Sequence, residues 1–355
     1  MTTQTAPGGT PAARPRTAST ATRRALLAAG LAGLIAATAA CGSSAGGSAS
    51  GNGPVKLSLT AYSTPAAAYA ELIPAFQHTA AGKNVTFTQS YGASGAQSRA
   101  IAAGLPTDIA ALSLAPDIDK LVKAGLVDTN WANDSYQGFV TDSVVVFTVR
   151  KGNPKGIRTW ADLLKPGIQI VTPNPFTSGS ARWNVMAAYG AQLKQGKTDA
   201  QATAWVRQMF THVVAQDKDA RTALQTFTGG KGDVLLGYEN DAIAAQQAGQ
   251  PVSYVIPDQT ILIQNPIAVL SKSKHQAQAK AFIDFLRTPE AQKIFAKHGY
   301  RPVIPLLVDT SQFPTPPGLF TIKDVGGWPQ VNTTFFDATK GLLVGIEHSL
   351  GVTTG

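Results

Sequence analysis

Apolar and polar positions alternate with two different periods along most of this chain. Residues 55–61 alternate apolar and polar side chains, as a half-buried strand does, and residues 65–79 repeat apolar side chains at helical spacing. This succession recurs as far as residue 298. Further strands are expected at 85–89, 108–112, 168–171, 233–238, 252–256 and 267–271. Further helices are expected at 94–104, 115–124 and 159–164, from 178, from 199, and at 220–228, 240–249, 276–286 and 289–298.

Strands that alternate with helices in this way predict an α/β fold with mostly parallel sheets and flanking helices. A helix-free β pattern at 143–150 interrupts the alternation. Residues 302–355 contain several prolines and one expected amphipathic helix, roughly 329–350, and are interpreted as a tail that packs back on the body. At about 150 residues per domain, a length of 355 residues predicts two domains.

The N-terminus has the pattern of an export signal. Paired arginines at 23–24 precede an apolar stretch at 25–40, which is short for a membrane-spanning helix. Small residues then lead to Cys41, the only cysteine. We therefore expect a lipoprotein signal peptide at 1–41 with the lipid on Cys41, although an uncleaved anchor would leave the folded part on the same side. The paired arginines suit the twin-arginine export route, with the general route open. The Gly/Ser-rich residues 42–53 predict a flexible tether.

Composition and charge exclude several classes of protein. Hydrophobic residues make up 44% of the chain and charged residues 14%, which excludes a disordered chain and a coiled coil. The formal net charge is +9, but four arginines and no acid lie in residues 1–41, so 26 basic and 21 acidic residues remain, a net of +5. The basic residues are scattered, which suits a small anionic ligand better than a nucleic acid.

Three polar turns, at residues 89–97, 173–180 and 217–221, each open an expected helix. Ser94 and Gln97 have the spacing of a capping box. Any one of these turns is read as an ordinary helix cap. Three together would direct several free backbone amides toward one crevice, and helix N-termini bind anions through such amides.

Other chemical motifs are absent or incomplete. The glycines at 229–232 lack the spacing of a nucleotide-binding loop, and residues 92–95 are one residue short of a nucleophile elbow. The five histidines are isolated, without a metal-binding pair. Glu239 and Asp241 open an expected helix, where acidic residues favour the helix dipole. We therefore expect no metal and no cofactor.

Several segments, in order along residues 55–340, match one known family. The most specific are Pro-Asn-Pro at 173–175 and Ala-Arg-Trp-Asn at 181–184, which related molybdate and phosphate binders do not share. The others lie at 90–95, 149–155, 178–180, 232–235, 238–240, 300–302 and 320–322. With these motifs the chain resembles the sulfate/thiosulfate-binding proteins of bacterial ABC importers.

The resemblance implies a two-lobed periplasmic-binding-protein fold of type II, with the ligand in the cleft between the lobes. Lobe I would comprise residues 54–145 and 256–301, and lobe II residues 146–255. The chain would cross between the lobes at 143–149 and 252–271. The family members act as monomers without cofactors and are not enzymes, which is the expectation for this chain too.

The resemblance also implies that neutral donors hold a dehydrated dianion, with Arg182 and Arg221 behind the pocket and not touching the ion. The donors would be the backbone amides of Ser63, Gly179, Ser180 and Ala220, the amide and hydroxyl of Ser94, the hydroxyl of Ser178 and the phenol of Tyr238.

Four positions depart from the family pattern. The family usually has Asp at Ser63, Gly at Ser180, Trp at Tyr238 and Gly at Asp219. Only a backbone donor is needed at Ser63, whereas Ser180 would either add a donor or crowd the anion. The Tyr238 phenol can replace an indole donor, but with a different reach. Asp219 is either an N-cap or a carboxylate that competes with the anion for the helix amides.

The implied function is capture of sulfate, or thiosulfate, by an exported protein that is lipid-anchored at the outer face of the cytoplasmic membrane. The partner would be an ABC permease, with no nucleic-acid partner. Two alternatives stay open. One is the same fold binding another oxyanion, phosphate or molybdate, with Asp219 as an acceptor. The other is a secreted serine hydrolase that uses Ser94 or Ser178.

Overall fold

The computed structural model describes residues 53–352. The expected signal peptide at 1–41, the lipidated Cys41 and all of the tether except its last residue lie outside the described residues. Among the described residues, no helix is long and apolar enough to cross a membrane.

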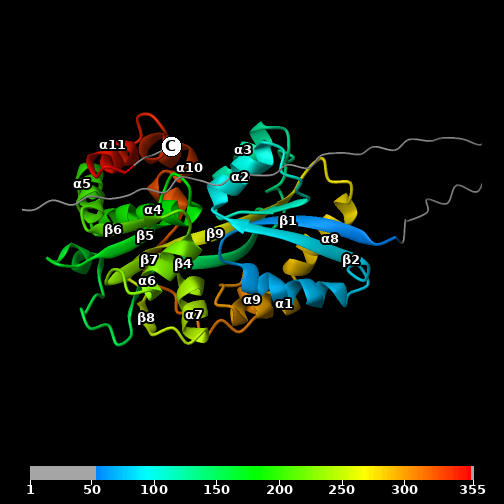
Figure 1. The fold of residues 1–355 in the computed structure, drawn as a ribbon, viewed down its shortest axis with the longest axis horizontal. Coiled ribbons are helices and arrows are strands. Elements are labelled where there is room, and N and C mark those ends of the chain that lie inside the picture. The colour runs from blue at the N-terminus through cyan, green and yellow to red at the C-terminus, as the bar shows by residue number, and fades with distance from the viewer. Residues whose placement is uncertain (1–52, 353–355) are drawn as a thin grey trace, which may run out of the picture. The chain divides into compact units, whose positions relative to one another are not determined.

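One group of elements, which we name the first lobe, surrounds three parallel strands. Strand β1 (Val55–Tyr62) lies between β2 (Val85–Gly92) and β3 (Ile109–Ala111). One face is covered by α1 (Ala66–Gln77), α8 (Gln276–Leu286) and α9 (Pro289–Lys297), and the other by α2 (Ser94–Ala102) and α3 (Ala115–Lys123) (Figure 1). Aromatic rings fill the first of these interfaces, with Phe76 and Phe282 centred 5.1 Å apart.

A second group, the second lobe, repeats this arrangement. Strand β5 (Ile170–Pro173) lies parallel between β6 (Val213–Asp217) and β7 (Val234–Tyr238). Strand β8 (Val252–Val255) comes later in the chain. The helices are η1 (Trp160–Leu164), α4 (Gly179–Lys194), α5 (Asp199–Phe210), α6 (Ala220–Thr228) and α7 (Glu239–Gln247). The sequence pattern did not predict β6, because all five of its residues are half-buried and no inside–outside alternation appears.

Two long strands are shared by the lobes. The first half of β4 (Phe139–Arg150) pairs antiparallel with β9 (Gln259–Val269), and its second half pairs antiparallel with β7 and β8. Strand β9 also pairs with β3. The sheet order is therefore β2-β1-β3-β9-β4-β7-β5-β6, parallel within each lobe and antiparallel where the lobes join. Of the expected second crossing segment, only β9 reaches the first lobe's strands, since β8 pairs with β4 alone.

The C-terminal segment pairs with β9 through one strand and packs against α4. It contains η2 (Pro305–Leu307), β10 (Gly318–Phe320), η3 (Ile322–Val325), α10 (Gly327–Phe335) and α11 (Leu342–Ser349). The rings of Trp328 and Trp183 lie 4.8 Å apart, and those of Phe335 and Tyr189 lie 4.7 Å apart. The single helix expected at 329–350 was wrong.

A local turn explains why this helix breaks in two. The Asp337 carboxylate accepts hydrogen bonds from the backbone amides of Thr339 and Lys340, each at 3.0 Å. The Gly341 amide donates to the Asp337 carbonyl at 3.0 Å. Such side-chain bonds offer the backbone an alternative to the helix, although the apolar spacing continues.

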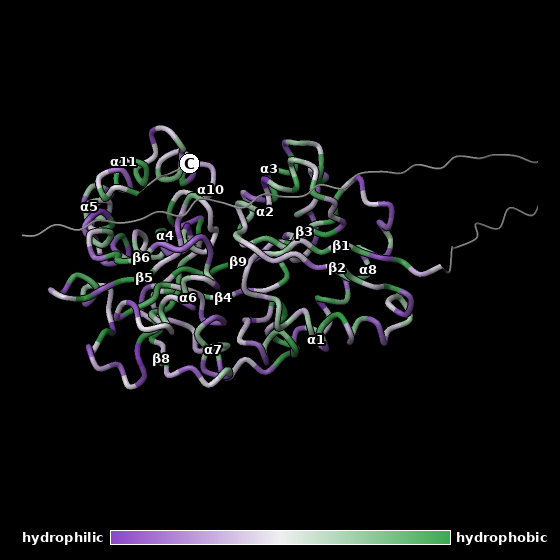
Figure 2. Tube along the Cα trace, viewed as in Figure 1, coloured by the Kyte–Doolittle hydropathy of each residue, from purple (hydrophilic) through white to green (hydrophobic). Residues whose placement is uncertain are grey.

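The burial pattern explains why the start of α4 is held in place. Hydrophobic residues follow the strands and the helix faces that meet them (Figure 2). Nearly every residue of α4 from Gly179 to Gln192 is buried, because the helix lies between the shared strands, α5 and the C-terminal segment. A helix buried all round cannot rotate or slide without opening its packing, so its first residues have a defined position.

Candidate functional site

Three helix N-termini and three strand ends meet at one small cavity between the lobes. Helix α2 begins there in the first lobe, and α4 and α6 in the second. In each lobe the carboxyl ends of the parallel strands and the helices that follow them lie at one edge, and both edges face the cavity. All seven residues predicted to contact an anion line this cavity. Its lining consists of Tyr62, Ser63, Thr64, Ser94, Ser113, Ser178, Gly179, Ser180, Ala220 and Tyr238.

The cavity is narrow and enclosed, with a volume of about 10 Å³. Every lining residue except Thr64 is buried. The lobes touch at Gly179, where a Cβ atom would lie 2.6 Å from Ser113 Oγ. The Trp183 indole also donates across the lobes to the Ser113 carbonyl at 2.9 Å. A cavity of this size excludes a sugar or a peptide.

Five backbone amides at the cavity have no hydrogen-bond acceptor in the described part of the chain. They belong to Ser63, Ser94, Gly179, Ser180 and Ala220. Four of the five are in the first turn of a helix, where no intrahelical acceptor exists and the helix dipole contributes partial positive charge. The cavity therefore presents converging N–H donors without a formal positive charge.

Hydroxyl groups add to these donors. Ser180 Oγ is fully buried and has no partner, which costs about 1–3 kcal/mol if it stays unpaired. The Ser178 hydroxyl makes no hydrogen bond to the described residues either. Tyr238 Oη lies 2.8 Å from Ser113 Oγ. Burial raises the pKa of the Tyr238 phenol well above its ordinary value, so the group keeps its proton and remains a donor.

The Ser94 side chain differs from its predicted role. The expected capping box with Gln97 is absent, because Ala93 is the N-cap of α2 and Gln97 Nε2 donates to Ser90 Oγ at 3.0 Å. Ser94 Oγ accepts from the Ser113 amide at 2.9 Å and donates to Asp117 Oδ2 at 2.7 Å. Its proton is thus directed at a carboxylate, and its amide is the group left for a ligand.

Asp219 is the N-cap of α6. Its Oδ1 accepts from the Thr222 amide at 2.9 Å and from the Thr222 hydroxyl at 3.1 Å. The carboxylate therefore occupies the third amide of the helix and leaves the Ala220 amide free. The competition with an anion that the sequence left open does not occur at Ala220.

The two predicted arginines lie outside the lining, as expected. Arg182 donates to the Pro175 carbonyl at 3.0 Å and to Asn332 Oδ1 at 3.2 Å, and burial lowers its pKa. The Arg221 guanidinium lies 5.9 Å from the centre of the Tyr91 ring. No lysine, arginine or histidine is among the residues that line the cavity in the described chain.

Sequence reasoning missed Tyr62, Thr64 and Ser113, which also line the cavity. Ser113 follows the carboxyl end of β3, as Ser63 follows that of β1, and this shared position was the available signal. Asp117, which holds Ser94, gave no signal, because its contact with Ser94 spans 23 residues.

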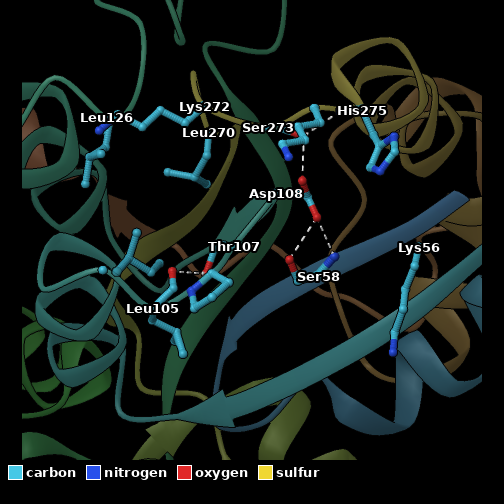
Figure 3. A pocket seen from close by; sticks show the side chains of 14 residues that line it. Lys56, Ser58, Leu105, Thr107, Asp108, Leu126, Leu270, Lys272, Ser273 and His275 are labelled. Carbon is cyan, nitrogen blue, oxygen red and sulfur yellow. Dashed lines mark hydrogen bonds between the residues drawn. The ribbon is translucent and has the colours of Figure 1, made fainter. Parts of the chain in front are cut away.

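A larger cavity of about 380 Å³ lies at the opposite ends of β1 and β3 (Figure 3). At its centre Asp108 accepts from the Ser58 amide at 2.7 Å and from Ser273 Oγ at 2.6 Å. Its central polar groups thus satisfy one another. In the described residues no three metal-ligating side chains come together, here or elsewhere.

Known proteins with similar sequences identify the family of this chain. A sequence profile for bacterial extracellular solute-binding proteins matches residues 57–301. The chain belongs to this family. Over 294 residues this solute-binding protein is 45% identical to a sulfate-binding protein of Synechococcus elongatus, covering 80% of this chain and 84% of the relative. It is 36% identical to a thiosulfate-binding protein of Pseudomonas aeruginosa, covering 76% and 85%.

A solved structure shares the fold. The sulfate-binding protein SubI from Mycobacterium tuberculosis is 44% identical, with a TM-score of 0.78, and the match covers 80% of this solute-binding protein and all of SubI. The two-lobed α/β fold of type II predicted from the sequence is confirmed. The lobe boundaries given from the sequence stay predictions.

Proposed function

We propose that this solute-binding protein captures sulfate, or the related thiosulfate, outside the cytoplasm and delivers it to an ABC importer. The observation that supports this most directly is the lining of the small cavity. Five acceptor-free amides converge there with hydroxyl donors, and no charged side chain lines it. A fully ionised oxyanion offers only hydrogen-bond acceptors, so it is complementary to a lining that offers donors.

The same lining disfavours phosphate, the first alternative. Near neutrality phosphate retains a proton and needs a buried acceptor. The carboxylates near the cavity are engaged, Asp117 by Ser94 and Lys120, and Asp219 by Thr222. An unpaired ligand proton costs about 1–3 kcal/mol, and more beside a charged group.

The number of donors is sufficient without a lysine. Each hydrogen bond to a charged group contributes about 1.5–3 kcal/mol, so the five amides and the hydroxyls of Ser178 and Tyr238 give roughly 10–20 kcal/mol. Micromolar affinity requires about 8 kcal/mol. The remainder offsets dehydration of the ion and the freedom lost on binding.

Delivery follows from donors on both lobes. Ser63 and Ser94 come from the first lobe, and Gly179, Ala220 and Tyr238 from the second. An ion held by both favours the form in which the lobes touch, and this form would be the one recognised by the permease. We further propose that lipid on Cys41 tethers a monomeric protein to the outer face of the cytoplasmic membrane. Metabolic labelling with a radioactive fatty acid, lost in Cys41→Ser, tests the anchor.

Calorimetric titration of the purified protein with sulfate, thiosulfate, phosphate and molybdate tests the proposal. We expect micromolar or tighter sulfate binding and phosphate at least about a hundredfold weaker. Tight phosphate or molybdate binding without sulfate binding would instead establish the alternative oxyanion. Esterase turnover that disappears in Ser94→Ala or Ser178→Ala would establish a hydrolase, although no histidine lines the cavity to activate either serine.

A further inference from the structure

Ser180 has a polar atom that the protein leaves without a partner. It is the second residue of α4 and is 4% exposed, and its Oγ makes no hydrogen bond. Buried polar atoms are nearly always paired, so an unpaired hydroxyl that lines a cavity is available to a ligand there. Of the other lining hydroxyls, Ser94 donates to Asp117 and Ser113 pairs with Tyr238, whereas Thr64 Oγ1 is also buried without a partner and Ser178 makes no hydrogen bond to the described residues.

Two acceptors could take the Ser180 proton. One is an anion in the cavity that Ser180 lines. The other is Asn184 Oδ1, one helical turn further along α4, which is also buried and unpaired. The Asn184 amide group donates to Thr172 Oγ1 at 3.1 Å and to the Leu236 carbonyl at 2.9 Å, so the orientation of its oxygen is set. A serine hydroxyl has one proton and serves only one of these acceptors at a time.

We propose that the Ser180 hydroxyl binds the anion directly and makes the protein prefer sulfate to thiosulfate. This inference rests on the proposed function. Thiosulfate carries a sulfur atom in place of one oxygen, and sulfur is larger and a weaker hydrogen-bond acceptor. In a cavity of about 10 Å³ with donors from both lobes, the sulfur has to face a donor that an oxygen would satisfy better. The Ser180 side chain also fills space that a glycine would leave open.

Two substitutions separate the hydrogen bond from the bulk. Ser180→Ala removes the hydroxyl and keeps Cβ, whereas Ser180→Gly removes both. We expect Ser180→Ala to weaken sulfate binding about tenfold and thiosulfate binding less than about threefold, as loss of one charge-assisted donor predicts. Ser180→Gly should weaken sulfate similarly and strengthen thiosulfate, so that it has the smallest sulfate-to-thiosulfate affinity ratio of the three proteins.

Ser143→Ala is the matched control. Ser143 is also a fully buried serine, but its hydroxyl donates to Asn240 Oδ1 at 2.9 Å and it does not line the cavity. We expect this variant to lose stability and to keep the wild-type affinity ratio. Each protein is titrated with sodium sulfate and sodium thiosulfate by calorimetry, after circular dichroism has verified that it is folded.

The outcomes distinguish this inference from the proposed function. If the wild type binds sulfate and Ser180→Ala binds both ions with unchanged affinity, Ser180 serves Asn184 and the inference is wrong. Equal losses for both ions would overturn the selectivity. If the wild type binds neither ion, the proposed function itself fails, and the inference with it. Should Ser180→Gly not fold, titration of Ser180→Ala with sodium selenate provides a second test of the hydroxyl. This larger ion with four oxygens should lose as much affinity as sulfate, and an unchanged selenate affinity would contradict the role of the hydroxyl.

Discussion

Two cavities lined by the first lobe, the small one between the lobes and the larger one around Asp108, lie at opposite ends of the same elements and have opposite chemistry. Strand β1 begins with Lys56 and Ser58 at the larger cavity and ends with Tyr62 at the small one. Helix α2 runs the other way, from Ser94 at the small cavity to its C-terminus at the larger. The small cavity therefore receives the positive end of the helix dipole, and the larger receives the negative end.

This comparison indicates that the proposed anion site does not depend on positive side chains. The larger cavity is lined by Lys56, Lys272, Lys274 and His275, and all three lysines are exposed to solvent. Exposed ammonium groups stay hydrated, and salt screens their attraction for an anion. The small cavity has no charged lining residue, but its donors are buried and already oriented. Preorganised neutral donors in a dry site interact more strongly with an ion than mobile charges in water.

The largest expected effect is at Gly179, where the lobes touch. A Cβ atom there would lie 2.6 Å from Ser113 Oγ and 2.8 Å from Leu114 Cδ2. Gly179→Asp adds both this clash and a negative charge beside the dianion, so sulfate affinity should fall more than about a thousandfold, equivalent to about 4 kcal/mol. Calorimetry measures it. Gly345→Ala, in open space on α11, is the control and should bind normally. Retained affinity in Gly179→Asp would remove Gly179 from the site.

The acids near the two cavities should respond to pH in opposite directions. Burial raises the pKa of Asp241, beside Tyr238, to about 7. The folded protein thus holds a proton that the unfolded chain has lost, and stability falls as pH rises from about 4 to 7. Asp241→Asn should therefore raise the melting temperature more at pH 8 than at pH 5. At about 1.4 kcal/mol per pKa unit, the difference in unfolding free energy is a few kcal/mol.

Asp108 is the counterpart at the larger cavity. Burial alone would raise its pKa, but hydrogen bonds from Ser273 and Ser58 outweigh it and lower the pKa. Its contribution is therefore present above about pH 4 and lost as pH falls through the folded value. Asp108→Asn should lower the melting temperature at pH 7 and have less effect at pH 3. Thermal unfolding in sulfate-free buffer measures both variants, and a shift of the same sign for both at neutral pH would contradict the comparison.

A smaller effect is expected from removing one neutral donor. Tyr238→Phe keeps the ring and deletes the phenol that faces Ser113 and the cavity. Sulfate affinity should fall about tenfold to a hundredfold, as expected for one hydrogen bond to a charged group. Because burial raises the phenol pKa, this loss should be constant between pH 6 and 9. Tyr254→Phe, at a half-buried tyrosine on β8, is the control. An unchanged affinity in Tyr238→Phe would show that the phenol serves Ser113 alone.

The strands, helices and turns that the sequence predicts correctly are those determined by interactions between residues close together in the chain. Alternating strands and helices, and the polar turns before α2, α4 and α6, follow from periodicity and capping preferences. That the proposed ion contacts fall at these turns came from the resemblance. The three helix starts share one cavity because the parallel strands of each lobe end at the edge that faces the other lobe.

What failed depended on contacts distant in sequence or on one-residue differences. Ser94 was predicted to cap α2, but the helix starts one residue earlier and the hydroxyl is taken by Asp117, 23 residues away. The final helix was predicted as continuous because its apolar spacing continues, yet the Asp337 side chain closes a turn within it. The strand at 108–112 was predicted, so the position of Ser113 at its end was available from the sequence, but the contact of Ser113 with Gly179, which is distant in sequence, was not.

The smallest expected effect completes the comparison. Replacing Lys56, Lys272 and Lys274 together by alanine removes the lysines around the larger cavity (Figure 3). At 0.15 M salt the screening length is about 8 Å, so exposed charges at the far end of β1 should change sulfate affinity less than about twofold. Alanine at Lys151, Lys155 and Lys231, exposed lysines of the second lobe, changes the net charge equally and is the control. A loss above about fivefold in the first triple variant alone would place an anion among those lysines. A loss shared by both triple variants would reflect the long-range field of the whole protein.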